Sequence, residues 1–356
     1  MPENITRFLE KSPLTASAPC RVDMGGTLDI KTIYLPMGHL SPATFNLAID
    51  LRTEVTLRPH TAGVVKVSSR GFDSVEFPAA DAPYDHPLGL MFAIAAHYNA
   101  AGLHLDIRSA SPPKSALGGS SAAAVALVCA LESINSGKKE VSRKEIALTA
   151  HAIEEGAARI PCGLQDQLAA VYGGANAWFW RSFDGRSDFR RSIIMDEARC
   201  LDFNQCFLVA YCGVQHESSN INGRWMSHFV RAENRALWRK IIHYAGSFIE
   251  ALSTGQLDEA ILSMNRESDL RKQMTPDVFD DMGDRLVLSA RETECGARFT
   301  GAGGGGCVWA LGDPDNISRL KGKWEAILRA REDALLLNTR IDTRGVTAPD
   351  GIMLTD

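Results

Sequence analysis

Short segments in the first third of the chain alternate apolar and polar residues, which is the pattern of β-strands. Between residues 18 and 70 the clearest examples are TEVTLRP (53–59) and VVKVSS (64–69), and LHLDIRS (103–109) repeats the pattern. Because successive side chains of a strand point to opposite faces, this alternation predicts strands with one buried and one solvated face. Such strands are typical of an antiparallel sheet.

Apolar residues at helical spacing occur next to these strands. PLGLMFAIAAHYNA (87–100) and RKEIALTAHAIEEGAA (143–158) both show this spacing. The longest uninterrupted apolar run extends from Ala122 to Leu131. A helix that is apolar all round must be buried, so this run predicts a core helix.

The second half of the chain begins with a buried strand, FLVAYCG (207–213), and continues with amphipathic helices. We expect these helices at 219–253, 256–272 and 277–295. Strands that come mostly early and helices that come mostly late indicate an α+β fold. A chain of 356 residues is long enough for two lobes. We place the boundary near Cys200, which gives an N-terminal domain at 1–200 and a C-terminal domain at 201–356.

Composition and charge narrow the class of protein. Hydrophobic residues make up 45% of the chain, and the net charge of −5 gives no reason to expect nucleic acid as a partner. The longest apolar run is about half of a membrane crossing, and the charged start MPENITRFLEK argues against a signal peptide. The 8 cysteines are scattered without a CxxC pair, which predicts free thiols in a reducing compartment. We therefore expect a cytoplasmic protein that binds neither nucleic acid nor membranes.

The core helix is preceded by a loop rich in small residues, SPPKSALGGSS (111–121). The first turn of a helix exposes unpaired N–H groups and a partial positive charge. The small residues Gly118–Gly119–Ser120–Ser121 let an anion approach these groups, which predicts a phosphate-binding loop. The alternative is a turn before a core helix that Ser120 or Ser121 caps. No GxxxxGK[ST] motif occurs, so the loop is not a Walker loop.

Three glycine-containing stretches follow one another along the chain: APCRVDMGG (18–26), PPKSALGGSSAA (112–123) and TGAGGGGCV (300–308). They resemble the three motifs of the GHMP kinases, on the sugar-kinase side of the family, with galactokinase, fucose kinase and heptose-phosphate kinase. The resemblance implies a two-lobed fold with an N-terminal mixed or antiparallel sheet, a C-terminal α/β lobe and an active site in the cleft between them. It also implies ATP and Mg²⁺ as cofactors.

The second of these motifs is expected to bind the nucleotide. By the resemblance, its binding residues are Lys114, Ser115, Ala116, Leu117, Gly118, Gly119, Ser120 and Ser121. The family usually has glycine where Ala116 stands, and one glycine fewer than Gly118–Gly119. An alanine costs little at this position unless the backbone requires a positive φ.

The same resemblance suggests residues for metal binding and catalysis. In the family a serine of the second motif and a glutamate on a neighbouring helix bind Mg²⁺, which here implies Ser121 and Glu154. A spacing like that of mevalonate kinase would select Glu155 instead. PCGLQDQ is similar to the PCGxxDQ of galactokinase, so Asp166 is expected to face the acceptor hydroxyl with Arg21 beside it. A neighbouring guanidinium would keep Asp166 ionised, whereas the alternative role for Asp166 is a helix cap.

The acceptor is expected to be a sugar or a sugar phosphate. GGTLD (25–29) stands where galactokinase has the longer GEHTD, which argues against galactose and is more similar to the GGGTD of heptose-phosphate and fucose kinases. We expect substrate contacts from Gly26, Asp29, Gln165, Gly303 and Gly304. His39 and Arg224 are further pocket candidates, with solvated or packing roles as the alternative. The glycine run 303–306 is entropically costly, which suggests that it closes the cleft.

Together these assignments predict an ATP-dependent kinase that phosphorylates a sugar at its anomeric hydroxyl. One alternative is a mevalonate-type kinase of a non-sugar alcohol, which the PCGLQDQ segment makes less favourable. The other is a sugar- and ATP-binding sensor without catalysis, which has no need of Ser121, Glu154, Asp166 and Arg21 together. The sequence leaves the oligomeric state open.

Overall fold

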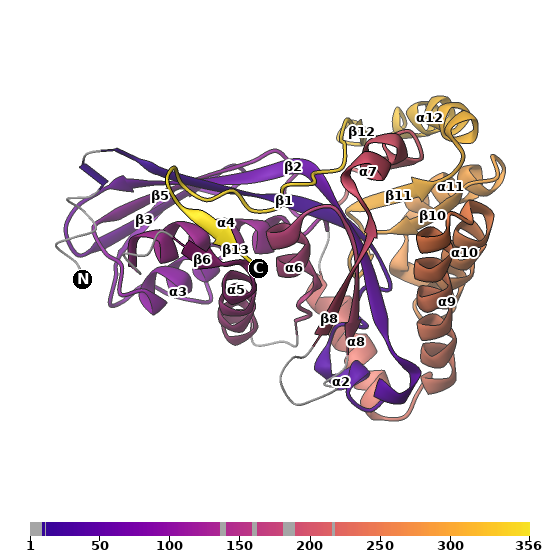
Figure 1. Cartoon of the computed structure of the whole chain (residues 1–356), viewed down its shortest axis with the longest axis horizontal. Helices are drawn as coiled ribbons and strands as arrows, with labels where there is room; N and C mark the ends of the chain where they lie inside the picture. The colour runs from indigo at the N-terminus through magenta and orange to yellow at the C-terminus, as the bar shows by residue number, and fades with distance from the viewer. Residues whose placement is uncertain (1–8, 11, 136–139, 159–161, 181–188, 216–217) are drawn as a thin grey trace.

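One large sheet forms the framework of the molecule and reaches into both lobes (Figure 1). The computed structural model describes residues 9–10, 12–135, 140–158, 162–180, 189–215 and 218–356. The described strands run in the order β4-β3-β5-β2-β7-β8, with β1 paired to β2 beside this path. They are β1 Leu14–Met24, β2 Ala43–Pro59, β3 Val64–Ser69, β4 Val75–Pro78, β5 Leu103–Ser109, β7 Ala175–Trp180 and β8 Phe189–Met195. β3 and β5 are parallel whereas the other pairs are antiparallel, so the sheet is mixed.

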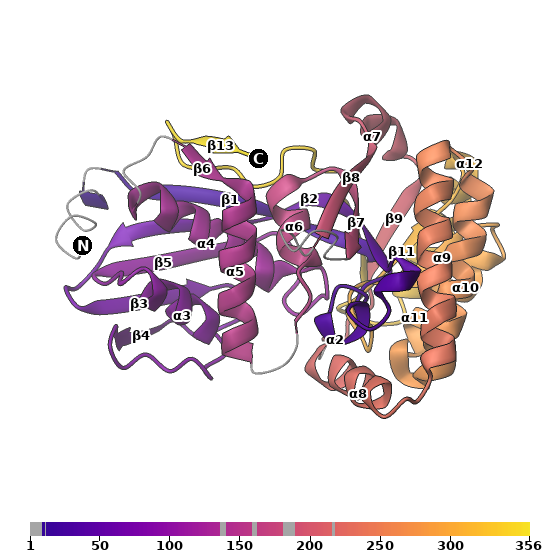
Figure 2. The same ribbon diagram turned by 60° about the horizontal axis from the view of Figure 1, so that its bottom comes forward.

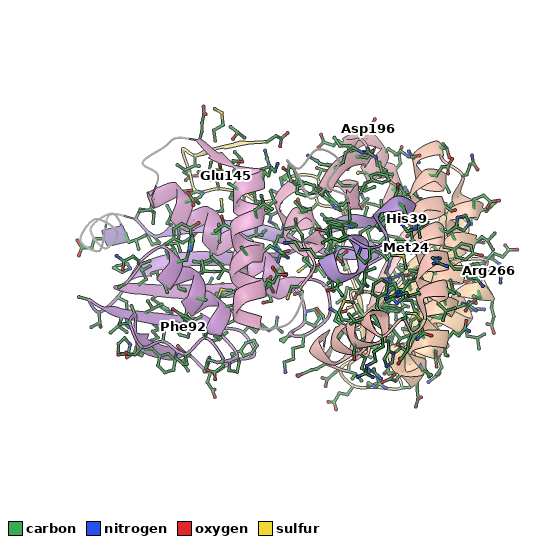
Figure 3. All side chains as sticks on the ribbon, turned by 90° about the horizontal axis from the view of Figure 1, so that it is seen from below. Met24, His39, Phe92, Glu145, Asp196 and Arg266 are labelled. Atoms are coloured by element: carbon green, nitrogen blue, oxygen red, sulfur yellow. The ribbon has the colours of Figure 1, made fainter. Side chains whose placement is uncertain are left out.

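Helices cover one face of this sheet (Figure 2). They are α3 Gly89–His97, α4 Gly119–Asn135, α5 Arg143–Ala158 and α6 Gln165–Tyr172. α4 packs against β1 and β2, and its run from Ala122 to Leu131 is no more than 6% exposed, which confirms the predicted core helix. On α3, the ring of Phe92 lies edge-to-face with that of Phe77 at 5.3 Å, and Figure 3 shows how such side chains fill the space between helix and sheet.

The second lobe is built on a smaller antiparallel sheet in the order β10-β11-β9-β12. Its strands are β9 Phe207–Tyr211, β10 Gly296–Phe299, β11 Cys307–Leu311 and β12 Leu335–Leu337. Its helices are α8 Ser218–Val230, α9 Arg235–Thr254, α10 Leu257–Met274, α11 Asp281–Arg291 and α12 Pro314–Leu328. Short helical segments complete the described chain: α2 Lys31–Tyr34, η1 Gly38–Leu40, α7 Glu197–Phe203 and η2 Pro276–Val278.

The helix predicted at 219–253 is in fact two helices, α8 and α9. The chain turns between them, where Ala232 and Asn234 adopt φ angles of 66° and 59°. The apolar spacing continues on both sides of this turn, so periodicity alone does not reveal the break. α8 and α9 then pack against different parts of the β1–β2 connection, α8 against α2 and α9 against η1.

The last residues of the chain return to the first lobe (Figure 1). β13 Met353–Thr355 pairs in parallel with β6 Glu140–Ser142. The amide of Thr347 donates to the carbonyl of Ser17 at 2.8 Å, and the Arg52 guanidinium donates to the Asp342 carboxylate at 2.5 Å. The domain boundary at residue 200 therefore stays a prediction. The C-terminal segment, although it follows the second lobe in sequence, lies against the first lobe.

Two expectations from composition can be compared with the structure. Six of the cysteines are buried free thiols, as predicted: Cys20, Cys129, Cys200, Cys212, Cys295 and Cys307. Among the helices that the structure describes, none has the length and apolar character needed to cross a membrane.

Candidate active site

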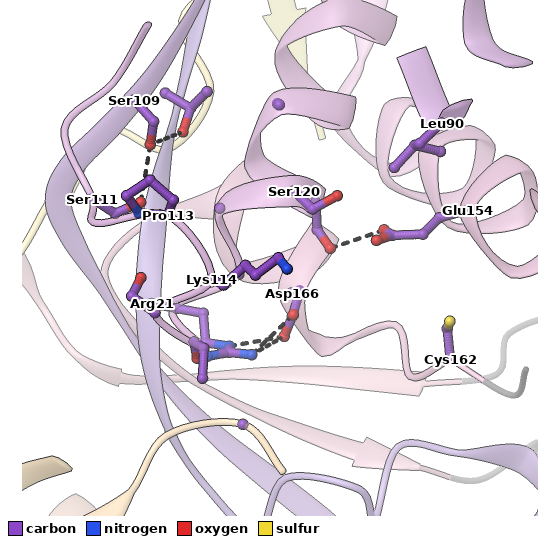
Figure 4. Close-up of a pocket in the computed structure, with 18 of the residues that line it drawn as sticks. Arg21, Leu90, Ser109, Ser111, Pro113, Lys114, Ser120, Glu154, Cys162 and Asp166 are labelled. Carbon is purple, nitrogen blue, oxygen red and sulfur yellow. Dashed lines mark hydrogen bonds and ion pairs between the residues drawn. The ribbon is translucent and has the colours of Figure 1, made fainter. Parts of the chain in front are cut away.

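All three motifs line one cleft of about 390 Å³ (Figure 4). β1 contributes Arg21, the loop before α4 and the first turn of this helix contribute most of the residues between Ser111 and Ser121, and the third motif contributes Gly301. Glu154 of α5 and Asp166 of α6 complete the polar wall. Residues that are far apart in the sequence thus meet because β1, α4, α5 and α6 pack around one point.

The loop before α4 alternates in backbone handedness. Lys114, Ala116 and Gly118 adopt φ angles of 52°, 62° and 75°. A left-handed residue beside a right-handed one turns successive N–H groups toward one side, which forms a concavity that binds anions. The amide of Arg21 donates to the carbonyl of Leu117 at 2.9 Å and holds the loop on β1, while the Leu117 side chain is buried in the core. Ala116 therefore occupies a position that does require a positive φ, at a cost of about 1 kcal/mol.

The first turn of α4 meets α5 through Ser121 and Glu154. Ser121 Oγ donates to the Glu154 carboxylate at 2.8 Å, and Gln167 Nε2 donates to the same oxygen at 2.6 Å. Burial raises the pKa of Glu154 to about 7; the hydrogen bond from Ser121 lowers it and the charge of Asp166 raises it further. Of the two neighbouring glutamates, Glu154 lines the cleft and Glu155 does not.

Arg21 and Asp166 form a two-pronged ion pair at the centre of the cleft (Figure 4). Arg21 Nε and Nη2 donate to the two Asp166 oxygens at 2.8 and 2.9 Å, and Nη1 donates to the Ala116 carbonyl at 2.6 Å. Burial lowers the pKa of Arg21, but the carboxylates of Asp166 and Asp23 outweigh it and raise this pKa above its ordinary value. The N-cap of α6 is Leu164, so Asp166 lies in the first turn and does not cap the helix.

The polar groups at one end of the cleft come from the first motif and the start of α6. The buried carboxylate of Asp29 accepts from the amide of Gln165 at 3.0 Å, and burial raises the pKa of Asp29 to about 7. Gly163 is required here, because a Cβ on it would lie 1.7 Å from Asp29 Oδ2. Gln165 lines the cleft, and its Oε1 accepts from Asn46 Nδ2 at 3.0 Å. Gly26, expected to contact substrate, does not line the cleft; a Cβ on it would be 3.0 Å from Gln165 Nε2.

The third motif contributes different residues from those expected. Gly301 and Ala302 line the cleft, whereas Gly303 and Gly304 do not and instead face side chains of η2 and α8. A Cβ on Gly306 would lie 2.6 Å from the carbonyl oxygen of Ser115, which belongs to the second motif. The glycine run therefore permits close contact between two backbones, and its contact with substrate stays a prediction.

The two further pocket candidates lie away from the cleft. His39 is in η1, which contacts α9 (Figure 3). Arg224 Nη1 and Nη2 donate to the Asp277 carboxylate at 3.2 and 2.8 Å on the molecular surface. Neither His39 nor Arg224 lines the cleft, and the packing or solvated roles considered for them fit these positions.

A buried ion network that the sequence did not reveal joins the first and third motifs. Asp23 accepts from the Gly301 amide at 2.6 Å and from Arg298 at 3.0 Å. Glu267 of α10 bonds both Arg298, at 2.9 Å, and Arg271, at 2.7 Å. Burial raises the pKa of Glu267, but Arg298 and Arg271 outweigh it and hold this pKa below its usual value. The network fixes the loop at Gly301 against the strand that carries the Arg21 side chain.

Comparison with known proteins supports the motif assignments. Residues 86–174 match the family described as GHMP kinases N terminal domain. A galactokinase of Roseiflexus sp. (strain RS-1) is 29% identical over 140 residues, which are 37% of this chain and 35% of that protein. The chain thus spans about a third of the length of this curated relative. The resemblance to the GHMP kinases is confirmed over residues 86–174.

Solved structures of GHMP kinases share the complete fold. Galactokinase from Lactococcus lactis, complexed with galactose, superimposes with a TM-score of 0.74 at 16% identity, over 96% of this chain and 98% of that one. Mevalonate kinase from Methanococcus jannaschii gives 0.69 at 18% identity, over 93% and 99%. These likenesses confirm the predicted two-lobed fold, and at such low identities they carry no information on the substrate.

Proposed function

We propose that this protein is an ATP-dependent kinase that transfers the γ-phosphoryl group of ATP to a sugar hydroxyl, at the anomeric position. The observation that carries the proposal is the direct contact between the phosphate-binding loop and the candidate catalytic carboxylate. A Cβ added to Gly118 would lie 3.3 Å from Asp166 Oδ2, so loop and carboxylate adjoin without an intervening side chain. Phosphoryl transfer depends mainly on such positioning.

The two ends of the cleft suit the two substrates. Leu88, Leu90, Met91 and Ile107 form an apolar end, which suits a nucleotide base. The triphosphate would then lie along the loop of alternating handedness and at the N-terminus of α4. Lys114 lines the same part of the cleft and supplies a positive charge beside the phosphates. This arrangement leaves the end with Asp29 and Gln165 for the acceptor.

Ser121 and Glu154 are suited to hold Mg²⁺. Mg²⁺ prefers oxygen ligands and is commonly bound by one or two carboxylates together with substrate phosphates. Ser121 Oγ and a Glu154 carboxylate oxygen lie 2.8 Å apart at the start of α4. No cluster of three or more histidine, cysteine, aspartate or glutamate side chains that could hold a metal occurs in the described part of the chain. When bound, the ion would neutralise charge on the phosphates.

Asp166 and Arg21 would act on the acceptor hydroxyl. Asp166 orients the hydroxyl and accepts its proton late, as the new P–O bond forms and the bond to the ADP oxygen breaks. A loose transition state needs little nucleophilic push, so a weakly basic carboxylate is sufficient. The Arg21 guanidinium, held by two bonds to Asp166, stabilises the developing charge next to it.

The test is an ADP-release screen of ATP with free sugars, phosphorylated sugars and mevalonate, with NMR of the product to locate the new phosphate. We expect Mg²⁺-dependent turnover with a sugar and a product phosphorylated at the anomeric carbon. Preferred turnover of mevalonate would replace the proposal with a mevalonate-type kinase. Binding of sugar and ATP without turnover would replace it with a sensor.

A further inference from the structure

The acceptor end of the cleft receives a side chain from the C-terminal lobe. Asn222 of α8 lines the cleft together with Thr27, Asp29 and Ile30 of the first lobe. α8 contacts α2, the short helix that directly follows Ile30, so Asn222 belongs to this end and not to the apolar one. Arg224, two residues further along α8, forms the surface ion pair with Asp277.

Asn222 has an unused hydrogen-bonding group in this place. Its Oδ1 is buried and has no hydrogen-bond partner among the described residues. A buried polar atom is normally paired, so an orphaned one in a cleft calls for a ligand. Gln165 also lines the cleft; its amide oxygen is held by Asn46, and its Nε2 group is a donor. Amide and carboxyl groups of this kind bind hydroxyls.

The charges at this end disfavour an anionic acceptor. Asp29 and Asp166 both line it, and the one guanidinium among the described residues there, that of Arg21, is engaged on all sides by Asp166 and the Ala116 carbonyl. Lys114 also lines the cleft, from the loop before α4, and so does Arg70, which directly follows β3. A second phosphate on the acceptor would meet the carboxylates of Asp29 and Asp166 at this end.

We propose that the acceptor is an uncharged sugar and that Asn222 is a specificity-determining residue, whose amide oxygen accepts a hydrogen bond from one of the sugar hydroxyls. This inference rests on the proposed kinase function and narrows its substrate class. It also gives the C-terminal lobe a part in acceptor selection, since Asn222 lines the cleft from α8.

The experiment measures ADP release with matched acceptors. Neutral aldohexoses, deoxyhexoses and heptoses are each compared with the phosphate ester of the same sugar, and mevalonate serves as a carboxylate acceptor. The acceptor KM and kcat are then measured with the best acceptor for Asn222→Leu and Asn222→Asp. Asn316→Asp on α12, remote from the cleft, is the matched control. Nucleotide KM is measured in parallel.

We expect turnover with neutral sugars and at least about tenfold lower kcat/KM with their phosphate esters. Asn222→Leu, which removes the accepting oxygen, should raise the acceptor KM by about tenfold or more. Asn222→Asp, which keeps an accepting oxygen, should raise it much less, and all three variants should keep the nucleotide KM. A role of Asn222 in folding alone would not separate the two KM values.

Several results would overturn the inference. Preferred turnover of a phosphate ester or of mevalonate refutes the neutral acceptor but leaves the kinase function intact. An unchanged acceptor KM in Asn222→Leu refutes the role of Asn222 in specificity. If no acceptor in the panel releases ADP, the kinase function itself fails, and the inference fails with it.

Discussion

Replacing Glu154 with glutamine should stabilise the metal-free protein and weaken nucleotide binding at the same time. Glu154 carries a carboxylate in a largely buried place, where it accepts hydrogen bonds from Ser121 and Gln167 and forms no ion pair with a described residue. Glutamine is isosteric and still offers an accepting oxygen, but it carries no charge. The substitution thus isolates the cost of holding a negative charge at this position.

The size of the effect follows from the pKa of Glu154, which burial raises from 4.5 to about 7. Between these values the folded state binds more protons than the unfolded state, so stability falls as pH rises through this window. Well above pH 7 the folded protein has lost all of the stability that the raised pKa contributes at low pH. This loss is at most about 3 kcal/mol, because the side chain keeps some contact with solvent. Glu154→Gln should therefore gain stability over wild type near pH 8 and show no gain near pH 4.

Urea unfolding of the metal-free protein at the two pH values measures the first effect, and calorimetric titration with Mg·ADP measures the second. Glu154→Gln should weaken Mg²⁺-dependent ADP binding by at least about tenfold, as expected from the loss of a metal ligand. Glu155→Gln is the matched control, since Glu155 is adjacent and does not line the cleft. The reasoning would be refuted if Glu155→Gln, and not Glu154→Gln, abolished the metal dependence, or if Glu154→Gln were less stable than wild type near pH 8.

Three further substitutions test the site and its support. Asp166→Asn should lower kcat by at least about a hundredfold and leave ATP binding intact, and kcat near wild type in the ADP-release assay would contradict the role of this carboxylate. Gly118→Ala places a methyl group 3.3 Å from Asp166 Oδ2 at a φ of 75°, so thermal unfolding should show a loss of about 1–2 kcal/mol with reduced kcat; an unchanged kcat would argue against close contact between loop and carboxylate. Arg52→Met removes the closer of the two arginine partners of the buried Asp342 and leaves Arg344 at 3.6 Å, which should lower the free energy of unfolding by about 2 kcal/mol and expose the C-terminal segment to limited proteolysis; unchanged protease resistance would show that the segment is held without the Arg52 pair.

Local pattern was sufficient for much of the fold. The strands at 64–69 and 103–109 and the helix at 143–158 have the bounds that their periodicity predicts. The break between α8 and α9 was missed because it depends on two residues in left-handed conformations, which leave the apolar spacing unchanged. The return of the C-terminal segment was missed because pairing between residues such as Ser17 and Thr347 leaves no mark on the sequence near either one.

The candidate site divides in the same way. The resemblance to the GHMP kinases brought together Arg21, Asp166, Ser121 and Glu154, which do meet in the cleft. Asn222 had no signal at all, because its importance arises only from the packing of α8 against the first lobe. The buried partners Asp23 and Arg298 were invisible for the same reason, since a charged residue in a strand gives no indication of whether it is paired.

The contact of the C-terminal segment with β1, β2 and β6 has a consequence for biosynthesis. Chains emerge from the ribosome from the N-terminus, and domains commonly fold in that order. Here Arg52 lacks its carboxylate partner, and β6 its neighbouring strand, until Asp342 and β13 have been translated. The lobe that is made first is therefore completed only after the other lobe has been made, and in a nascent chain stalled before residue 342 Arg52 would lack its carboxylate partner.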